Sequence, residues 1–102
     1  MSTADLLSMD ELTQAAPIIR VAAHPIRLRI IDLLSKTECS VGEIAEIVGC
    51  SQPVASQHLA VMREHGILTA HRDGQRMIYR LQIKALVRLI GCIREHCQGI
   101  PG

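Results

Sequence analysis

The sequence predicts a mainly α-helical domain with one β-hairpin, in the order α-α-α-α-β-β-α. Apolar residues recur at helical spacing along most of the chain. One stretch, residues 67–81, changes to the alternating spacing of strands. Hydrophobic residues make up 48% of the chain, yet Tyr79 is its one aromatic residue among Phe, Trp and Tyr. The core must therefore be aliphatic, which favours packed helices.

Length and composition limit the class of protein. A chain of 102 residues predicts a single domain spanning 1–102. No apolar run approaches the roughly 18 residues of a membrane span. The opening "MSTADLLSMDE" lacks the basic start of an export signal, so we expect a cytoplasmic protein. In that setting four cysteines are more typical of free or functional thiols than of disulfides.

Two helices are expected before residue 36. Ser8 and Glu11 have the spacing of a capping box, which begins a first helix over about 8–23. Pro17 predicts a kink or a split within it. Pro25 suits the first position of the second helix. The apolar stripe of the second helix is expected to consist of Ile26, Ile30, Leu33 and Leu34.

A helix-turn-helix is predicted at about residues 40–65. "SVGEIAEIVG" forms the shorter helix and "SQPVASQHLAVMREHG" the longer one, and a tight Gly-Cys turn joins them. Their start and stop signals are Ser40, Glu43, Gly49, Ser51 and Gly66.

A hairpin follows at about residues 67–81, "ILTAHRDGQRMIYRL", with Asp73-Gly74 as its two-residue turn. A hairpin directly after a helix-turn-helix is a wing, so the predicted fold is a winged helix-turn-helix. A last helix is expected over about 83–97.

The longer helix has a polar face suited to reading DNA. Ala55, Leu59 and Met62 fall on its buried side. The opposite side carries Gln52, Pro53, Ser56 and Gln57. Short amides and hydroxyls can bond base edges in the major groove of double-stranded DNA, whereas a solvated surface is usually rich in Lys and Glu.

Arginines near this helix predict phosphate contacts. Arg63 lies late in the helix, and Arg72 and Arg76 flank the hairpin turn. The alternative is a polar helix face that contacts only water, beside a surface hairpin. The ordered combination of short helix, tight turn, polar helix and basic hairpin favours DNA binding.

The last helix is apolar on two sides. One stripe contains Ile83, Leu86, Ile90, Ile93 and Cys97, and the other contains Ala85, Leu89, Cys92 and His96. Such a helix needs two partners. We expect a homodimer through the first and last helices, which would set two recognition helices about one DNA turn apart. The alternative is complete burial within one chain.

In these motifs the chain resembles the ArsR/SmtB family of winged-helix repressors. The matching segments are "AAHPIRLRIIDLL", "SVGEIAEIVGCSQPVASQHLAVMREHGIL" and "RDGQRMIYRL". The C-terminal "ALVRLIGCIREHC" is similar to the branch that includes HlyU, YgaV, BigR and SqrR. The resemblance implies a homodimer that leaves its operator when an effector binds. By position, Gln52, Ser56 and Gln57 match DNA-reading residues, and Cys97 matches the C-terminal thiol of the branch.

The chain departs from the family at its effector sites. Residues 38–44 read "ECSVGEI" where the metalloid box has the form ELCVCDL. The last helix begins "IKALVR", without the Asp and His of the other common metal site. Asp32 occupies the place of the partner thiol in the branch that senses reactive sulfur or oxidants.

Cys97 is the main effector-sensing candidate, with Cys39 and Cys92 beside it. Cys92 and Cys97 are separated by about 140° of rotation and roughly 7.5 Å of rise on a helix, so they do not easily bond each other. The remaining pairs are Cys39 with Cys97, or Cys92 or Cys97 across a dimer. Cys50 lies beside the N-terminus of the longer helix, where the helix dipole would favour a thiolate whose modification would block DNA. The favoured alternative is a small apolar residue that fills the turn. A soft metal or metalloid would use Cys39, His96 and Cys97.

The sequence is compatible with three functions. The first is a transcriptional repressor released from operator DNA by reactive sulfur or an oxidant at cysteine. The second is a repressor that responds to a metalloid or soft metal through Cys and His ligands. The third is a dimeric interaction module that does not bind DNA. No Ser-His-Asp, paired-carboxylate or phosphate-loop pattern indicates an enzyme.

Overall fold

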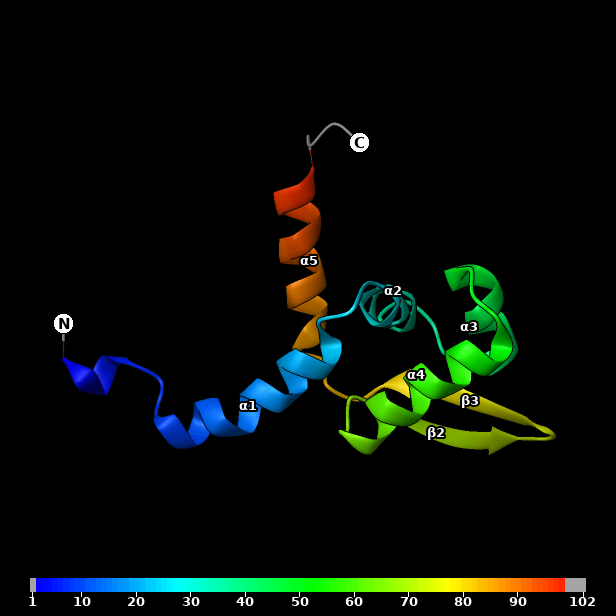
Figure 1. The fold of residues 1–102 in the computed structure, drawn as a ribbon, viewed down its shortest axis with the longest axis horizontal. Helices are drawn as coiled ribbons and strands as arrows, with labels where there is room; N and C mark the ends of the chain where they lie inside the picture. The colour runs from blue at the N-terminus through cyan, green and yellow to red at the C-terminus, as the bar shows by residue number, and fades with distance from the viewer. Residues whose placement is uncertain (1, 99–102) are drawn as a thin grey trace.

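Five α-helices and a small antiparallel sheet make up residues 2–98, the part of the chain that the computed structural model describes (Figure 1). The predicted winged helix-turn-helix is confirmed, with its five helices and its hairpin in the predicted order and two short additional elements, η1 and β1. The elements are the 3-10 helix η1 (Thr3–Asp5), α1 (Met9–Ala22), α2 (Pro25–Leu34), β1 (Cys39–Ser40), α3 (Val41–Val48), α4 (Gln52–Glu64), β2 (Leu68–Asp73), β3 (Arg76–Leu81) and α5 (Leu86–Cys97).

Local capping begins the helices where the sequence predicts. The Ser8 hydroxyl accepts from the Glu11 N–H at 3.1 Å, and the Glu11 carboxylate accepts from the Ser8 N–H at 3.1 Å. Ser40 and Glu43 form the same reciprocal pair at the start of α3. These bonds satisfy backbone donors that a helix leaves unpaired, and each cap contributes about 1 kcal/mol.

Pro17 lies inside α1, which runs unbroken from Met9 to Ala22. Of the two expected effects of Pro17, a kink or a split, the split does not occur. Proline removes one backbone donor, but the capping box at Ser8 holds the first turns, and Ala22 anchors the last turn in the core at 1% exposure.

The sheet has three strands in the order β1-β3-β2. Strands β2 and β3 form the predicted hairpin. Strand β1 was not predicted, because a strand of two residues has no periodic pattern. Cys39 and Ser40 become a strand by pairing with Tyr79 and Ile78 of β3. The hairpin turn also differs by one residue. Asp73 pairs with Arg76, so Gly74 and Gln75 form the loop. Gly74 takes φ +66° at the first loop position, as a type II′ turn requires.

The last helix begins at Leu86, three residues later than expected. Residues 83–85 form a tight turn, in which the Leu86 N–H donates to the Ile83 carbonyl at 3.1 Å. Ala85 offers no side-chain cap at this end.

An aliphatic core joins α2 to the helix-turn-helix and the base of the wing. Its largest fully buried side chains are Ile30, Ile31, Ile44, Leu59, Met62, Ile67, Leu68 and Leu81. On α2 the buried stripe is Ile30, Ile31 and Leu34, and Ile26 and Leu33 are only partly buried.

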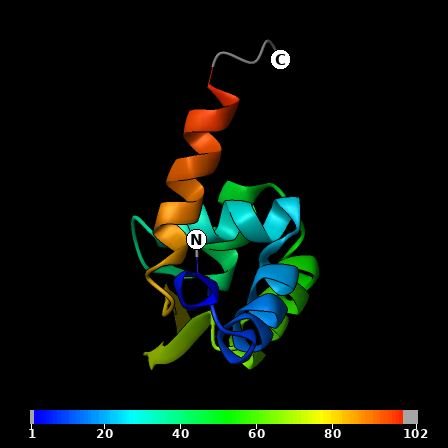
Figure 2. The same ribbon diagram turned by 90° about the vertical axis from the view of Figure 1, so that its left-hand side faces the viewer.

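Two helices extend away from this body. Figures 1 and 2 show α5 rising from it, and Figure 1 shows α1 running out to one side. The molecule measures 54 × 36 × 20 Å along its principal axes. Within residues 2–98, the helices are all too short or too polar to cross a membrane.

Candidate DNA-binding interface

The two faces of α4 separate cleanly into buried and exposed residues. Ala55, Leu59 and Met62 are each 0% exposed and hold the helix against the core. The outward face carries Gln52, Pro53, Ser56 and Gln57, all exposed. The helix thus presents short uncharged side chains to the outside.

The turn before α4 fixes the direction of that face. Gly49 has φ +89° and ends α3, and the Cys50 N–H donates to the Ala45 carbonyl at 3.0 Å. The Ser51 hydroxyl then accepts from the Val54 N–H at 3.3 Å and caps α4. The N-terminus of α4, with its partial positive charge, consequently lies beside Gln52.

The arginines of the wing lie on opposite sides of the hairpin. Arg72 pairs with Met77, and Arg76 pairs with Asp73. Because side chains alternate along a strand, Arg72 shares the face of Met77, and Arg76 occupies the other face. Among residues 2–98, Arg72 has no carboxylate partner, and neither does Arg63 on α4.

Arg76 is already bound to a carboxylate. Its guanidinium donates to Glu43 Oε1 at 2.5 Å, which links the wing to the start of α3. The Ser40 backbone hydrogen bond and the Arg76 charge both lower the pKa of Glu43. The predicted phosphate-contacting Arg76 therefore has its charge balanced in this structure.

A contact behind the outward face of α4 was not predicted. Arg27 Nε donates to His58 Nδ1 at 3.1 Å, and its Nη1 donates to the Val21 carbonyl at 3.0 Å. The His24 and His58 rings lie 4.7 Å apart between centroids. The signal in the sequence was a cation at position 27, in the row of Ile30, Ile31 and Leu34.

Known proteins resemble the chain in sequence and in fold. Residues 24–70 match the model of the "Bacterial regulatory protein, arsR family". The Escherichia coli HTH-type transcriptional regulator YgaV is 38% identical over 83 residues, which cover 80% of this chain and 84% of YgaV. The chain belongs to the arsR family. This is a family of DNA-binding transcriptional regulators and not of enzymes, as predicted.

Solved structures agree with this assignment. The transcriptional repressor BigR from Xylella fastidiosa is 31% identical, with a TM-score of 0.79 over 93% of this chain and 95% of BigR. A homodimeric winged helix-turn-helix domain from Mycobacterium bovis is 26% identical, with a TM-score of 0.74 over 96% of this chain and 98% of that domain. YgaV and BigR confirm the branch of the family that the C-terminal helix indicated.

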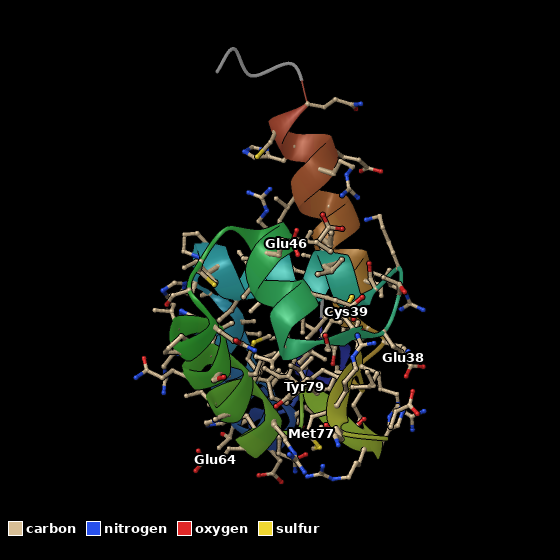
Figure 3. The ribbon with its side chains drawn as sticks, turned by 90° about the vertical axis from the view of Figure 1, so that its right-hand side faces the viewer. Glu38, Cys39, Glu46, Glu64, Met77 and Tyr79 are labelled. Atoms are coloured by element: carbon tan, nitrogen blue, oxygen red, sulfur yellow. The ribbon has the colours of Figure 1, made fainter. Side chains whose placement is uncertain are left out.

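The four cysteines of this arsR-family chain are free and differ in exposure. Cys39 is 3% exposed, and burial together with the Glu43 charge raises the pKa of its thiol. Figure 3 shows Cys39 near Tyr79 in the interior, between α3 and the hairpin. Cys50 is half-buried against the core. Cys92 and Cys97 are exposed on α5.

The proposed Cys39, His96 and Cys97 cluster is not assembled within one chain. Residues 2–98 contain no group of three His, Cys, Asp or Glu side chains that could hold a metal ion. Cys39 is held in β1, paired with β3 of the wing, whereas α5 carries His96 and Cys97 away from the body (Figure 1). For the same reason, Cys39 and Cys97 are separate thiols here.

Asp32 occupies the expected place of the second sensing thiol, and its carboxylate forms ion pairs with two basic side chains. Lys36 Nζ lies 2.6 Å from Oδ1, and Arg94 Nη2 lies 2.9 Å from Oδ2. The Lys36 hydrogen bond is the main cause of the lowered pKa of Asp32. At this position a charge contact, not a thiol, joins α2 to α5.

Proposed function

We propose that this arsR-family chain is a single-domain, homodimeric transcriptional repressor in the cytoplasm, which binds double-stranded operator DNA and is released when an effector reacts at a cysteine of α5. The main support is the outward face of α4, an uncharged polar surface beside a basic wing. A major groove accepts a helix of this kind, and its floor offers the hydrogen-bonding groups that amides and hydroxyls recognise.

Three residues of α4 would read the bases. Gln52, Ser56 and Gln57 are exposed on one side of the helix, and Pro53 leaves room for close approach because it has no long side chain. Arg63 and Arg72 would bind phosphates. Arg76 would do so by exchanging Glu43 for a phosphate.

A second copy would cover the exposed apolar faces of α1 and α5. Their large exposed side chains include Met9 at 74%, Leu12 at 40%, Ile19 at 57%, Val87 at 41%, Leu89 at 37% and Ile93 at 36% exposure. Apolar surface on two projecting helices is typical of an interface. The neighbour from Mycobacterium bovis, which is homodimeric, supports the formation of a dimer.

The effector would act on Cys97, with Cys92 as the second accessible thiol. Both lie on α5, so their modification would alter the proposed dimer contact. A Cys97 thiolate that attacks the sulfane sulfur of a polysulfide would become a persulfide, and the shortened polysulfide would leave as a thiolate. Cys39 is a poor candidate because a buried thiol with a raised pKa reacts slowly.

DNA binding is tested with labelled duplexes from the region upstream of the gene that encodes this chain. We expect affinity to fall steeply with salt, because bound phosphates release counterions, and we expect a dimer by light scattering. A chain that is monomeric, or that binds duplexes without salt dependence, contradicts the proposal.

Release is tested on the bound complex with a polysulfide, peroxide, arsenite and zinc in separate arms. We expect release by the polysulfide or peroxide, and we expect the Cys97→Ser variant to stay bound. Release by arsenite or zinc alone would favour the metalloid or soft-metal repressor. Release of Cys97→Ser at the normal effector dose would remove Cys97 from the mechanism.

A further inference from the structure

One guanidinium joins three helices behind the outward face of α4. Arg27 stands in the first turn of α2. It donates through Nε to His58 in the middle of α4 and through Nη1 to the Val21 carbonyl near the end of α1. The planar guanidinium holds these two donors in a fixed relation, which a lysine cannot do.

Both partners of Arg27 depend on it. The last four carbonyls of a helix have no partner within the helix, and Val21 belongs to that group in α1. His58 lies next to Gln57 in sequence but on the half-buried side of α4. The contact therefore fixes the angle of α4 about its own axis relative to the end of α1.

We propose that Arg27 and His58 are positioning residues that fix the orientation of α4 relative to α1. Because α1 belongs to the proposed dimer interface, this contact would also place the two α4 helices of the dimer on DNA. This inference depends on the proposed function. Neither residue would contact DNA. The pair would act by holding Gln52, Ser56 and Gln57 at the orientation that the groove requires.

The junction needs a neutral His58. An imidazole can accept from Arg27 only through an unprotonated Nδ1. The charged and titratable groups that act on His58 are His24 and Arg27, both at the start of α2. Burial, followed by the His24 and Arg27 charges, lowers the pKa of His58. The contact is thus kept at neutral pH and is lost as pH falls below the usual histidine range.

Two substitutions at His58 separate positioning from simple packing. In His58→Asn the amide oxygen stands close to the place of Nδ1 and can accept from Arg27, but it does not titrate. In His58→Leu the ring is replaced by an apolar group of similar bulk that cannot accept. Arg27→Lys keeps the positive charge but loses the planar guanidinium that holds the two donors in a fixed relation. His65→Asn, at the exposed end of α4, is the matched control.

The experiment measures duplex affinity at about pH 7.5 and at about pH 5.0, near the lower limit of histidine titration, because the pKa of His58 is lowered. Dimer mass and melting temperature are recorded for each variant. We expect His58→Leu and Arg27→Lys to bind about tenfold more weakly at the higher pH while remaining folded dimers. We expect His58→Asn to bind duplexes as tightly as the wild type at the higher pH. At the lower pH its affinity should fall much less than that of the wild type. His65→Asn should follow the wild type.

The outcomes distinguish this inference from the proposed function. If the wild type binds DNA and His58→Leu binds equally well as a folded dimer, the positioning role is wrong and the DNA-binding proposal stands. If His58→Asn weakens on acidification as much as the wild type, His58 is not the group responsible. A wild type that does not bind duplexes overturns the proposed function and the inference together.

Discussion

Asp32 of α2 accepts a hydrogen bond from Arg94 of α5, with 2.9 Å between Oδ2 and Nη2. Arg94 stands one turn before Cys97, so this contact ties the cysteine-bearing end of α5 to the body of the domain. Lys36, two residues beyond the end of α2, binds the other oxygen of the same carboxylate. The contact suggests a first test of how firmly α5 is held.

Asp32→Asn should lower the free energy of unfolding by no more than about 1 kcal/mol, because both partners are partly exposed and solvent screens the pair. The pKa of Asp32 is lowered in the folded chain. Its contribution is therefore complete above its ordinary pKa near 3.8 and is lost as pH falls through the lower folded value. Urea unfolding at neutral and acid pH measures this. A double-mutant cycle with Arg94→Gln that shows no coupling would contradict the contact.

Glu43→Gln should raise duplex affinity by a few-fold while it weakens α3. The substitution releases Arg76 for phosphate and removes a negative charge near the wing. The Gln amide oxygen can still accept from the Ser40 N–H, but the N-terminus of α3 loses a favourable carboxylate charge, at a cost of about 0.3–1 kcal/mol. Fluorescence anisotropy and thermal melting measure the two effects separately. Glu46→Gln is the control, because Glu46 is an exposed acid of the same helix outside this contact. Equal affinity gains in both variants would point to net charge alone.

Gln57→Ala and Arg72→Gln should weaken DNA binding in different ways. Loss of a base contact lowers preference for the operator over random duplex by about 1–3 kcal/mol and leaves the salt slope unchanged. Loss of a phosphate contact weakens binding to all sequences and reduces the salt slope by about 1. Anisotropy titrations on both duplexes at several salt concentrations resolve the two patterns. A Gln57→Ala variant with wild-type preference would place the reading face elsewhere.

Thiol labelling should follow exposure and acidity. Cys92 and Cys97 are exposed and should react first with iodoacetamide, Cys50 should react more slowly, and Cys39 should react only on unfolding. Burial raises the pKa of the Cys39 thiol, so its thiolate fraction at neutral pH is lower than that of an ordinary cysteine. Peptide mass spectrometry over time gives the order. Protection of Cys92 in the concentrated protein, lost on dilution, would locate it in the dimer contact.

Gly49→Ala should destabilise the fold by about 1–2 kcal/mol, because Gly49 has φ +89° and a left-handed backbone is costly with a Cβ. Nothing outside the adjoining backbone lies within 4 Å of the added Cβ, so the cost is backbone strain and not a clash with other residues. Gly42→Ala is the matched control. Its Cβ would meet only the Gln52 amide at 3.7 Å, and its helical backbone should make alanine neutral or stabilising by up to about 1 kcal/mol. Urea unfolding of both variants decides the matter, and equal effects would contradict the assigned backbone.

Local signals predicted most of this fold. Capping pairs such as Ser40 with Glu43, and the spacing of Ala55, Leu59 and Met62, act within a few residues and can be read directly. The strand β1 could not be predicted, since Cys39 and Ser40 owe their conformation to Tyr79 and Ile78, about forty residues later.

The candidate site was predictable only in part. The outward residues of α4 follow from helical geometry. The Glu43 contact with Arg76 and the Arg27 contact with His58 join residues more than thirty positions apart, and no pattern in the sequence pairs them. The exposure of the cysteines likewise depends on how α5 leaves the body.

The scarcity of aromatic residues has a practical consequence. Tyr79 is the chain's one intrinsic fluorophore of the Tyr and Trp type, and it lies in the central strand opposite Ala70 on one side and Cys39 on the other. Its emission, excited in the near ultraviolet, therefore reports from a single known location at the root of the hairpin. Duplex DNA, an effector or a denaturant that disturbs this region can be followed without attaching a dye.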